Sequence, residues 1–173
     1  PEYDAVRVRN TACAGCMIHC GSIAKMNKGR YHGFWTEGPQ YETIWSFTGT
    51  IGVPDVGITV AANKLCADLG IDSVSAGNTI GFAYELYNRG LITKKDTGGL
   101  ELKFGNDEPV LTLIRQIAAK QGFGARLAEG TRELAKQVGQ GSEKYAIHVK
   151  GLELPGYDPR GLPSMGLNFM TSS

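Results

Sequence analysis

Cys13-Ala-Gly-Cys16-Met-Ile-His-Cys20 holds three of the four cysteines of the chain within a single short stretch. Thiolates are soft ligands, and sulfurs spaced by two and then three residues can converge on one small volume, as an iron–sulfur cluster requires. Gly15 can adopt backbone angles that other residues avoid, so the loop can curl around a cluster. The spacing therefore favours an iron–sulfur site to which this loop supplies most of the ligands, namely Cys13, Cys16 and Cys20.

Two other interpretations of these cysteines stay open. A structural zinc site could use them together with His19, although adjacent residues seldom point at one tetrahedral centre and a second ligand pair is missing. A disulfide framework would need a secreted protein and an even number of close cysteines. Cys66 lies in a helical pattern, where a single cysteine is typical of a buried core residue. We therefore expect the fourth cluster ligand to lie outside this chain.

Length and composition bound the class of protein. The 173 residues, 42% of them apolar, suit one domain, or one domain and part of another. A net charge of +1 with scattered Lys and Arg residues gives no support for nucleic-acid binding. The sequence has no apolar run of membrane-spanning length and no signal peptide, so clustered thiols favour a reducing, cytoplasmic setting without a membrane partner. The start at Pro1 predicts an excised piece of a longer protein.

The hydrophobic spacing predicts a mainly α fold: a helical domain with a cysteine loop, short β excursions and a Gly- and Pro-rich tail. Four helices are expected, over residues 55–70, 73–90, 107–122 and 125–138. Asp55 would cap the first, and Ser73 or Ser75 the second. Alternation predicts a strand over residues 145–149. Residues 29–41, rich in aromatics and glycine, suit a hairpin or irregular loop that either packs over the cysteine loop or lines a substrate cavity.

Several stretches in the same order resemble the aldehyde ferredoxin oxidoreductase family of tungsten enzymes. They are Cys13-x-x-Cys16-x-x-x-Cys20, Glu37-Gly-Pro-Gln-Tyr-Glu42, Asn63-x-x-Cys66-x-x-Leu69-Gly-Ile-Asp72, Gly122-Phe-Gly124 through Leu127-Ala-Glu-Gly130, and Leu152-Glu-Leu-Pro-Gly-Tyr-Asp-Pro-Arg-Gly161. The resemblance implies a longer protein with an N-terminal β domain and two helical domains. Residues 1–150 would then form a helical domain with the cluster cysteines and part of the pterin site. Residues 151–173 would begin a following helical domain.

The resemblance also implies cofactors and site residues. Cys13, Cys16 and Cys20 match ligands of a [4Fe-4S] cluster, whose fourth cysteine lies beyond Ser173. The cluster accompanies tungsten, or molybdenum, held by two pyranopterins.

Glu42 matches a glutamate near the metal that is proposed to transfer protons, and is the candidate catalytic residue. Gly70, Ile71 and Asp72 match the end of a pterin-binding motif, whose first aspartate is replaced by Ala67. From the residues alone, Glu42 could be an ordinary surface or capping glutamate, and Asp72 a helix cap.

The implied function is oxidation of an aldehyde to a carboxylate, with electrons passed to ferredoxin or an electron-transfer subunit; the isolated piece is expected to be inactive. The alternatives are an aromatic acyl-coenzyme A reductase of the same family and a non-catalytic iron–sulfur or zinc module. Some family members share a bridging iron between subunits, but the corresponding positions here are Ala61, Lys64 and Leu111. An oligomer held by that iron is therefore not expected.

Overall fold

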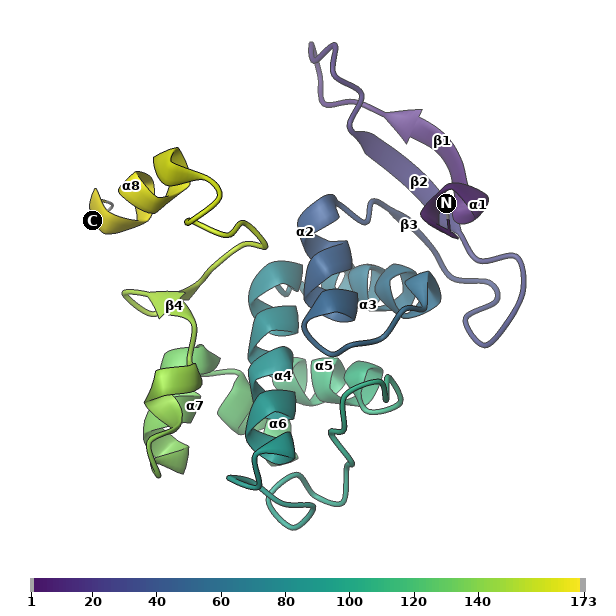
Figure 1. The fold of residues 1–173 in the computed structure, drawn as a ribbon. Coiled ribbons are helices and arrows are strands. Elements are labelled where there is room, and N and C mark those ends of the chain that lie inside the picture. The colour runs from purple at the N-terminus through teal and green to yellow at the C-terminus, as the bar shows by residue number, and fades with distance from the viewer. Residues whose placement is uncertain (1, 172–173) are drawn as a thin grey trace.

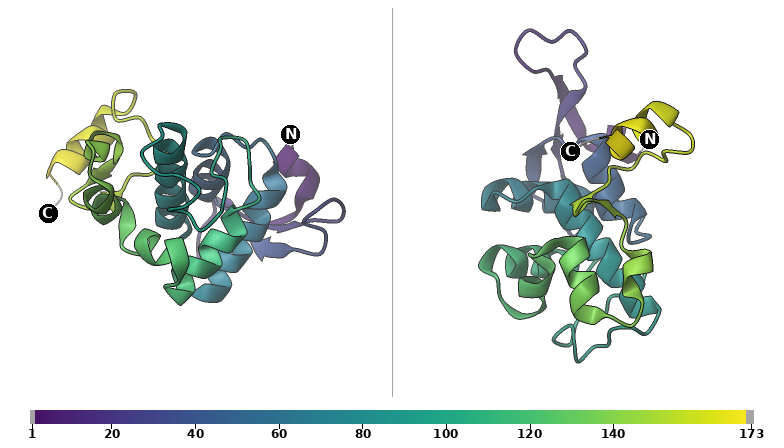
Figure 2. Two further views of the ribbon diagram at one scale, coloured as in Figure 1. Left: turned by 90° about the horizontal axis from the view of Figure 1, so that it is seen from below. Right: turned by 90° about the vertical axis from the view of Figure 1, so that its left-hand side faces the viewer.

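The computed structural model describes residues 2–171 and shows a body of packed helices from which a β-ribbon projects (Figures 1 and 2). The helices are α1 (Glu2–Val6), α2 (Tyr41–Ile44), α3 (Val56–Leu69), α4 (Ser73–Asn88), α5 (Val110–Ala119), α6 (Gly122–Leu127), α7 (Gly130–Val138) and α8 (Pro163–Thr171). A π-helical turn, η1 (Trp45–Gly49), continues α2, and a 3-10 turn, η2 (Ser142–Tyr145), follows α7. The expected mainly α fold is confirmed.

The strands form two small antiparallel sheets. They are β1 (Arg7–Thr11), β2 (Gly21–Lys25), β3 (Trp35–Glu37), β4 (His148–Val149) and β5 (Leu152–Glu153). The first sheet has the order β1-β2-β3, with Thr11 opposite Gly21, so the cysteine loop connects β1 to β2 at the end of the ribbon. The sequence did not predict this ribbon, because β1 is exposed on both faces and lacks an alternating apolar pattern.

The core lies where α3, α4, α5 and α7 meet. The largest fully buried side chains are Tyr84, Phe47, Ile51, Ile58, Ile80, Leu86, Leu102, Leu113, Ile114, Leu134, Val60 and Val110. Burying one such side chain contributes about 1.5–3 kcal/mol, so this cluster is the main source of stability. Glycine lets η1 approach α4 directly: a Cβ on Gly77 would lie only 2.5 Å from Ser46 Oγ. This contact fixes α2 and η1 on the side of α4.

Of the two predicted helix caps, one is confirmed and the other needs correction. The predicted Asp55 cap of α3 is confirmed, since Asp55 Oδ1 accepts the Gly57 N–H at 2.7 Å. The cap of α4, however, is Asp72 rather than Ser73 or Ser75, because Asp72 Oδ1 accepts the Ser75 N–H at 2.6 Å. Ser73 is instead the first residue of α4.

The last two predicted elements are also only partly correct. The single helix expected over residues 125–138 is divided into α6 and α7, because Gly130 takes a left-handed φ of 82°. The strand expected over residues 145–149 is reduced to β4, since Tyr145 belongs to η2. The left-handed backbone of Gly130 and the turn before it thus interrupt the helix that the hydrophobic spacing predicts.

The C-terminal segment runs from β5 across the body to α8, which has no buried residue (Figure 1). Within the described residues, no helix has the length and apolar character needed to cross a membrane. The proposed division at residue 150 stays a prediction.

Candidate functional site

The cysteine loop lies at the free end of the ribbon, away from the helical body (Figure 1). Cys13 and Cys20 are exposed and Cys16 is half-buried. The Cys16 N–H donates to the Cys13 carbonyl at 3.0 Å, which closes a turn in which Gly15 has a φ of 74°. The Ile18 N–H donates to Cys16 Sγ at 3.5 Å. Backbone N–H···S bonds of this kind tune cluster thiolates, so the loop suits this ligand type.

The three sulfurs do not converge in this conformation. Among residues 2–171, no group of three or more His, Cys, Asp or Glu side chains is arranged to hold a metal ion. The assignment of Cys13, Cys16 and Cys20 to a cluster therefore stays a prediction.

Cys66 is a core residue, as the sequence predicted. Its side chain is 1% exposed within α3. Burial, and secondly the negative charge of Asp72, raise the pKa of the Cys66 thiol to about 12. A thiol that stays protonated at neutral pH is a poor metal ligand.

Glu42 is held by a residue far along the chain. It lies in α2, and its Oε2 accepts the Gly156 N–H at 2.6 Å. Its other oxygen, Oε1, is buried and has no hydrogen-bond partner among the described residues. An unpaired buried carboxylate oxygen is energetically unfavourable, and it is typical of a group that meets a ligand or a proton donor. Glu42 is therefore neither an open surface residue nor a helix cap.

Tyr157 adjoins Glu42, and sequence reasoning did not single it out. The negative charge of Glu42 is the main cause that raises the pKa of the Tyr157 phenol, followed by desolvation. The Tyr157 ring stacks on Tyr41 with centroids 6.2 Å apart. Tyr157 thus stays protonated and can donate a hydrogen bond. It falls inside the matched stretch that ends at Gly161, but its contact with α2 appears only in the folded chain.

The candidate pterin residues lie in the turn between α3 and α4. The Gly70 and Ile71 N–H groups donate to the Ala67 and Cys66 carbonyls, and so close α3. One oxygen of Asp72 caps α4, so its expected alternative role as a cap is confirmed. Asp72 is exposed, and its second oxygen suits the amino and ring N–H donors of a pterin. The pterin contact itself stays a prediction.

The structure brings Glu42 and Asp72 to the same region. Thr43, which follows Glu42, and Ser73, which follows Asp72, share a hydrogen bond between their hydroxyls at 2.8 Å. The starts of α2 and α4 are thereby joined. A cofactor held near Asp72 would lie close to the element that carries Glu42.

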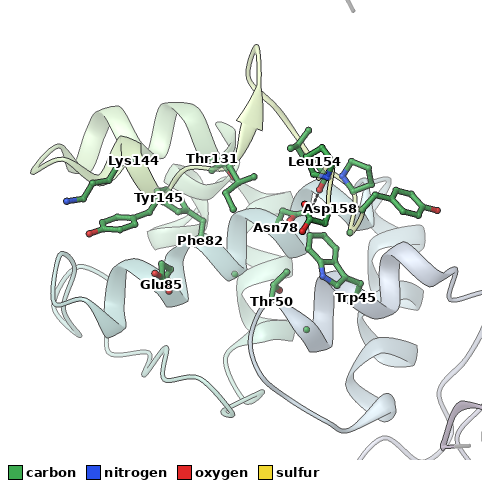
Figure 3. Close-up of a pocket in the computed structure, with 17 residues that line it drawn as sticks. Trp45, Thr50, Asn78, Phe82, Glu85, Thr131, Lys144, Tyr145, Leu154 and Asp158 are labelled. Atoms are coloured by element: carbon green, nitrogen blue, oxygen red, sulfur yellow. Dashed lines mark hydrogen bonds between the residues drawn. The ribbon is translucent and has the colours of Figure 1, made fainter. Parts of the chain in front are cut away.

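A cavity of about 630 Å³ lies between η1, α4 and residues 144–159 (Figure 3). Its lining includes the apolar side chains of Trp45, Phe82 and Tyr145 and the polar side chain of Asn78. Gly156 also lines it and donates a hydrogen bond to Glu42, so the Glu42 carboxylate adjoins the wall of the cavity. The volume suits a small organic ligand.

Residues 29–41 form an irregular loop and the strand β3, which pairs with β2, in line with the expected hairpin or irregular loop. Their aromatic side chains, however, neither pack over the cysteine loop nor line the cavity. Tyr31 is buried against the core and its hydroxyl donates to Asp107, next to α5. Phe34 packs edge-to-face on Tyr31, with ring centroids 6.4 Å apart. None of the residues that line the cavity comes from this segment. These aromatics attach the base of the ribbon to the helical body.

A thiol loop on a ribbon, a carboxylate with one buried, unpaired oxygen and an adjoining cavity describe a helical domain suited to a cofactor-dependent redox enzyme. Residues 2–173 match the family model described as aldehyde ferredoxin oxidoreductase, domains 2 & 3. The chain belongs to this family, and the resemblance inferred from its motifs is confirmed.

Relatives of this chain carry the name of the same family. The chain is 38% identical over 168 residues to the tungsten-containing aldehyde ferredoxin oxidoreductase of Pyrococcus furiosus, covering 96% of this chain and 27% of that protein. It is 40% identical over 170 residues to the protein of the same name from Pyrococcus horikoshii, with the same two coverages. The chain thus spans about a quarter of the length of these relatives.

A solved structure is also similar. The chain aligns with a chain of the active site complex BamBC of benzoyl coenzyme A reductase in complex with 1,5-dienoyl-CoA, with a TM-score of 0.70 and 28% identity. The alignment covers 87% of this chain and 22% of the other. Most of this chain therefore shares its fold with part of that complex.

Proposed function

We propose that this chain is part of a tungsten-pterin, [4Fe-4S] oxidoreductase that oxidises an aldehyde to a carboxylate and passes the electrons to ferredoxin or an electron-transfer subunit. The observation that carries the proposal is the Glu42 carboxylate, which has one oxygen fixed by Gly156 and the other buried without a partner. The family match and the names of the relatives supply the reaction class.

The residues of this chain fit the proposed cofactors. Cys13, Cys16 and Cys20 would hold the cluster, since their thiols lie in one loop and Cys16 already accepts a backbone N–H. Asp72 would contact a pterin through the oxygen that does not cap α4. When bound, the metal-pterin group, with tungsten or molybdenum, supplies two-electron chemistry and the cluster supplies single-electron transfer. The four unpaired cysteines accord with a reducing, cytoplasmic setting.

Glu42 would move the proton. Conversion of an aldehyde and a water molecule into a carboxylic acid releases two protons and two electrons, so a base near the reacting carbon is required. Oε1 of Glu42 can accept a proton while the Gly156 N–H keeps the carboxylate in one orientation. The protonated Tyr157 phenol, which adjoins Glu42, stabilises its negative charge. The cavity that Trp45 lines would bind the organic substituent of the substrate.

Glu42→Gln in the complete holoenzyme tests this role. We expect turnover of an aldehyde with a viologen dye to fall about 10²–10⁴-fold, the usual contribution of general acid–base catalysis. Tungsten and iron contents should be unchanged, because Glu42 is not a metal ligand in the proposal. Glu37→Gln, at an exposed glutamate of the same motif, is the control. Full turnover by Glu42→Gln would remove Glu42 from the mechanism.

A second candidate is a tungsten-containing aromatic acyl-coenzyme A reductase. The structural similarity to a benzoyl coenzyme A reductase complex favours it, as does the presence of Ala61 and Lys64 where some family members bind a bridging iron. An oligomer would then assemble by other contacts. Reduction of an aromatic thioester without aldehyde oxidation would select this function, and zinc without iron would instead indicate a non-catalytic module.

A further inference from the structure

Glu153, in β5, is an unusual buried residue that the proposed mechanism does not use. It is 8% exposed, and none of the ion pairs found in the described part of the chain involves it. Its Oε1 instead accepts the Thr131 N–H at 2.8 Å and the Thr79 hydroxyl at 3.3 Å. A buried carboxylate without a cation is costly, so these two contacts must fix it firmly in place.

The hydrogen bonds of Glu153 fix the segment that holds Glu42. Only two residues separate Glu153 from Gly156, whose N–H donates to Glu42 Oε2. Between them, the Leu154 carbonyl accepts from Asn78 Nδ2 at 3.2 Å, which attaches the segment to α4 (Figure 3). The segment is therefore held by α7 through Glu153 and by α4 through Asn78 before it reaches Glu42.

The segment cannot shift toward α2 either. A Cβ on Gly156 would lie 2.7 Å from the Trp45 indole, so the Gly156 backbone already packs directly on this ring. Trp45 belongs to η1, which directly continues the helix that carries Glu42. The position of the Gly156 N–H is thus determined from both sides, and this N–H decides which oxygen of Glu42 stays unpaired.

We propose that Glu153 is a positioning residue: by its reach to Thr131 it sets the place of the Gly156 N–H and, through it, the orientation of the Glu42 carboxylate. The effect on turnover rests on the proposed function, but the effect on the carboxylate does not. The reach of the Glu153 side chain, rather than its charge, is what the geometry requires, because its partners are a neutral amide and a hydroxyl.

Two conservative variants separate reach from charge. Glu153→Gln keeps the length and an acceptor oxygen, whereas Glu153→Asp keeps the charge and shortens the side chain by one methylene. Glu129→Asp is the matched control, because Glu129 is an exposed carboxylate at the same end of α7. The readout is the amide resonance of Gly156 in the complete protein, followed by NMR in a pH titration. The part of its chemical-shift change that disappears in Glu42→Gln is the part caused by Glu42.

We expect the Gly156 amide to follow the titration of Glu42 in the wild type, in Glu153→Gln and in Glu129→Asp. In Glu153→Asp its amplitude should fall several-fold, and in the holoenzyme kcat should fall about tenfold with KM little changed, as for a small misplacement of a reacting group. An unchanged amide titration in Glu153→Asp would overturn the proposal, as would a loss in Glu153→Gln alone. Should Glu42→Gln remain active, the proposed function fails, while the amide titration still tests the positioning role.

Discussion

The cysteine ribbon and the Glu42 junction are built in opposite ways. The ribbon carries its thiols within one exposed loop, and the contacts that shape this loop are local. The junction is partly buried and joins Glu42 to Gly156, which lie 114 residues apart. A soft metal group needs accessible ligands on an adaptable loop, whereas a proton-transfer group needs a rigid, water-poor surrounding. The two halves of the proposed site therefore respond to substitution differently.

Removing a loop thiol should have the largest effect. We expect Cys16→Ala to lose the cluster, because one iron would be left without a protein ligand. The iron content and the electron transfer to a dye should both fall to background. Cys66→Ala is the matched control and should keep its iron, since that thiol is buried and protonated. Iron analysis and electron paramagnetic resonance would check both. Retention of iron by Cys16→Ala together with loss by Cys66→Ala would reverse the assignment.

A substitution at the junction should lower turnover without changing the metal content. In Gly156→Ala the new Cβ would overlap the Trp45 indole, so the segment must move away and the bond to Glu42 lengthens. We expect kcat to fall about 10–100-fold and the free energy of unfolding to fall by about 1–3 kcal/mol. Steady-state kinetics and chemical denaturation measure the two effects. Gly161→Ala is a suitable control, because its Cβ would lie 3.6 Å from its nearest neighbour, an ordinary contact distance. Wild-type kcat in Gly156→Ala would show that this close packing does not place Glu42.

Cys66, in the helical core, gives a pH-dependent prediction. Burial raises the pKa of Cys66 from 9.0 to about 12, so the unfolded chain loses this proton at a lower pH than the folded chain. The resulting stability is complete below pH 9 and is lost as the pH rises toward 12. Above pH 9 the free energy of unfolding should fall by up to about 1.4 kcal/mol per pH unit from this group. Denaturation of Cys66→Ala at pH 8 and pH 10 should show a shallower fall, and an equal slope would contradict the assignment.

The smallest effects are expected at Asp72, where a helix cap and a proposed pterin contact coincide. Asp72→Ala should lower the free energy of unfolding by about 1 kcal/mol through loss of the cap, whereas Asp72→Asn should change it by only a few tenths, because Asn caps equally well. Pterin content should fall in both variants if the carboxylate contacts the cofactor. Full pterin occupancy in Asp72→Asn would leave Asp72 with its capping role alone.

The same contrast explains what the sequence could predict. The periodicity of α3 is a local pattern, and it predicted that helix directly. The spacing of Cys13, Cys16 and Cys20 is also a local pattern, but their role as cluster ligands stays a prediction. The ribbon could not be predicted because β1 is solvated on both faces. The break at Gly130 could not be predicted because the helical spacing of apolar residues continues through it. The partners of Glu42 could not be predicted, since the packing of α2 on the segment after β5 is set by the whole core.

The most direct test of the account is the metal content of the complete protein purified without oxygen. The account predicts about four iron atoms per chain, as a [4Fe-4S] cluster requires, together with tungsten or molybdenum and a reduced-state paramagnetic signal from the cluster. A colourless protein that contains zinc, or no metal, in place of iron would contradict it.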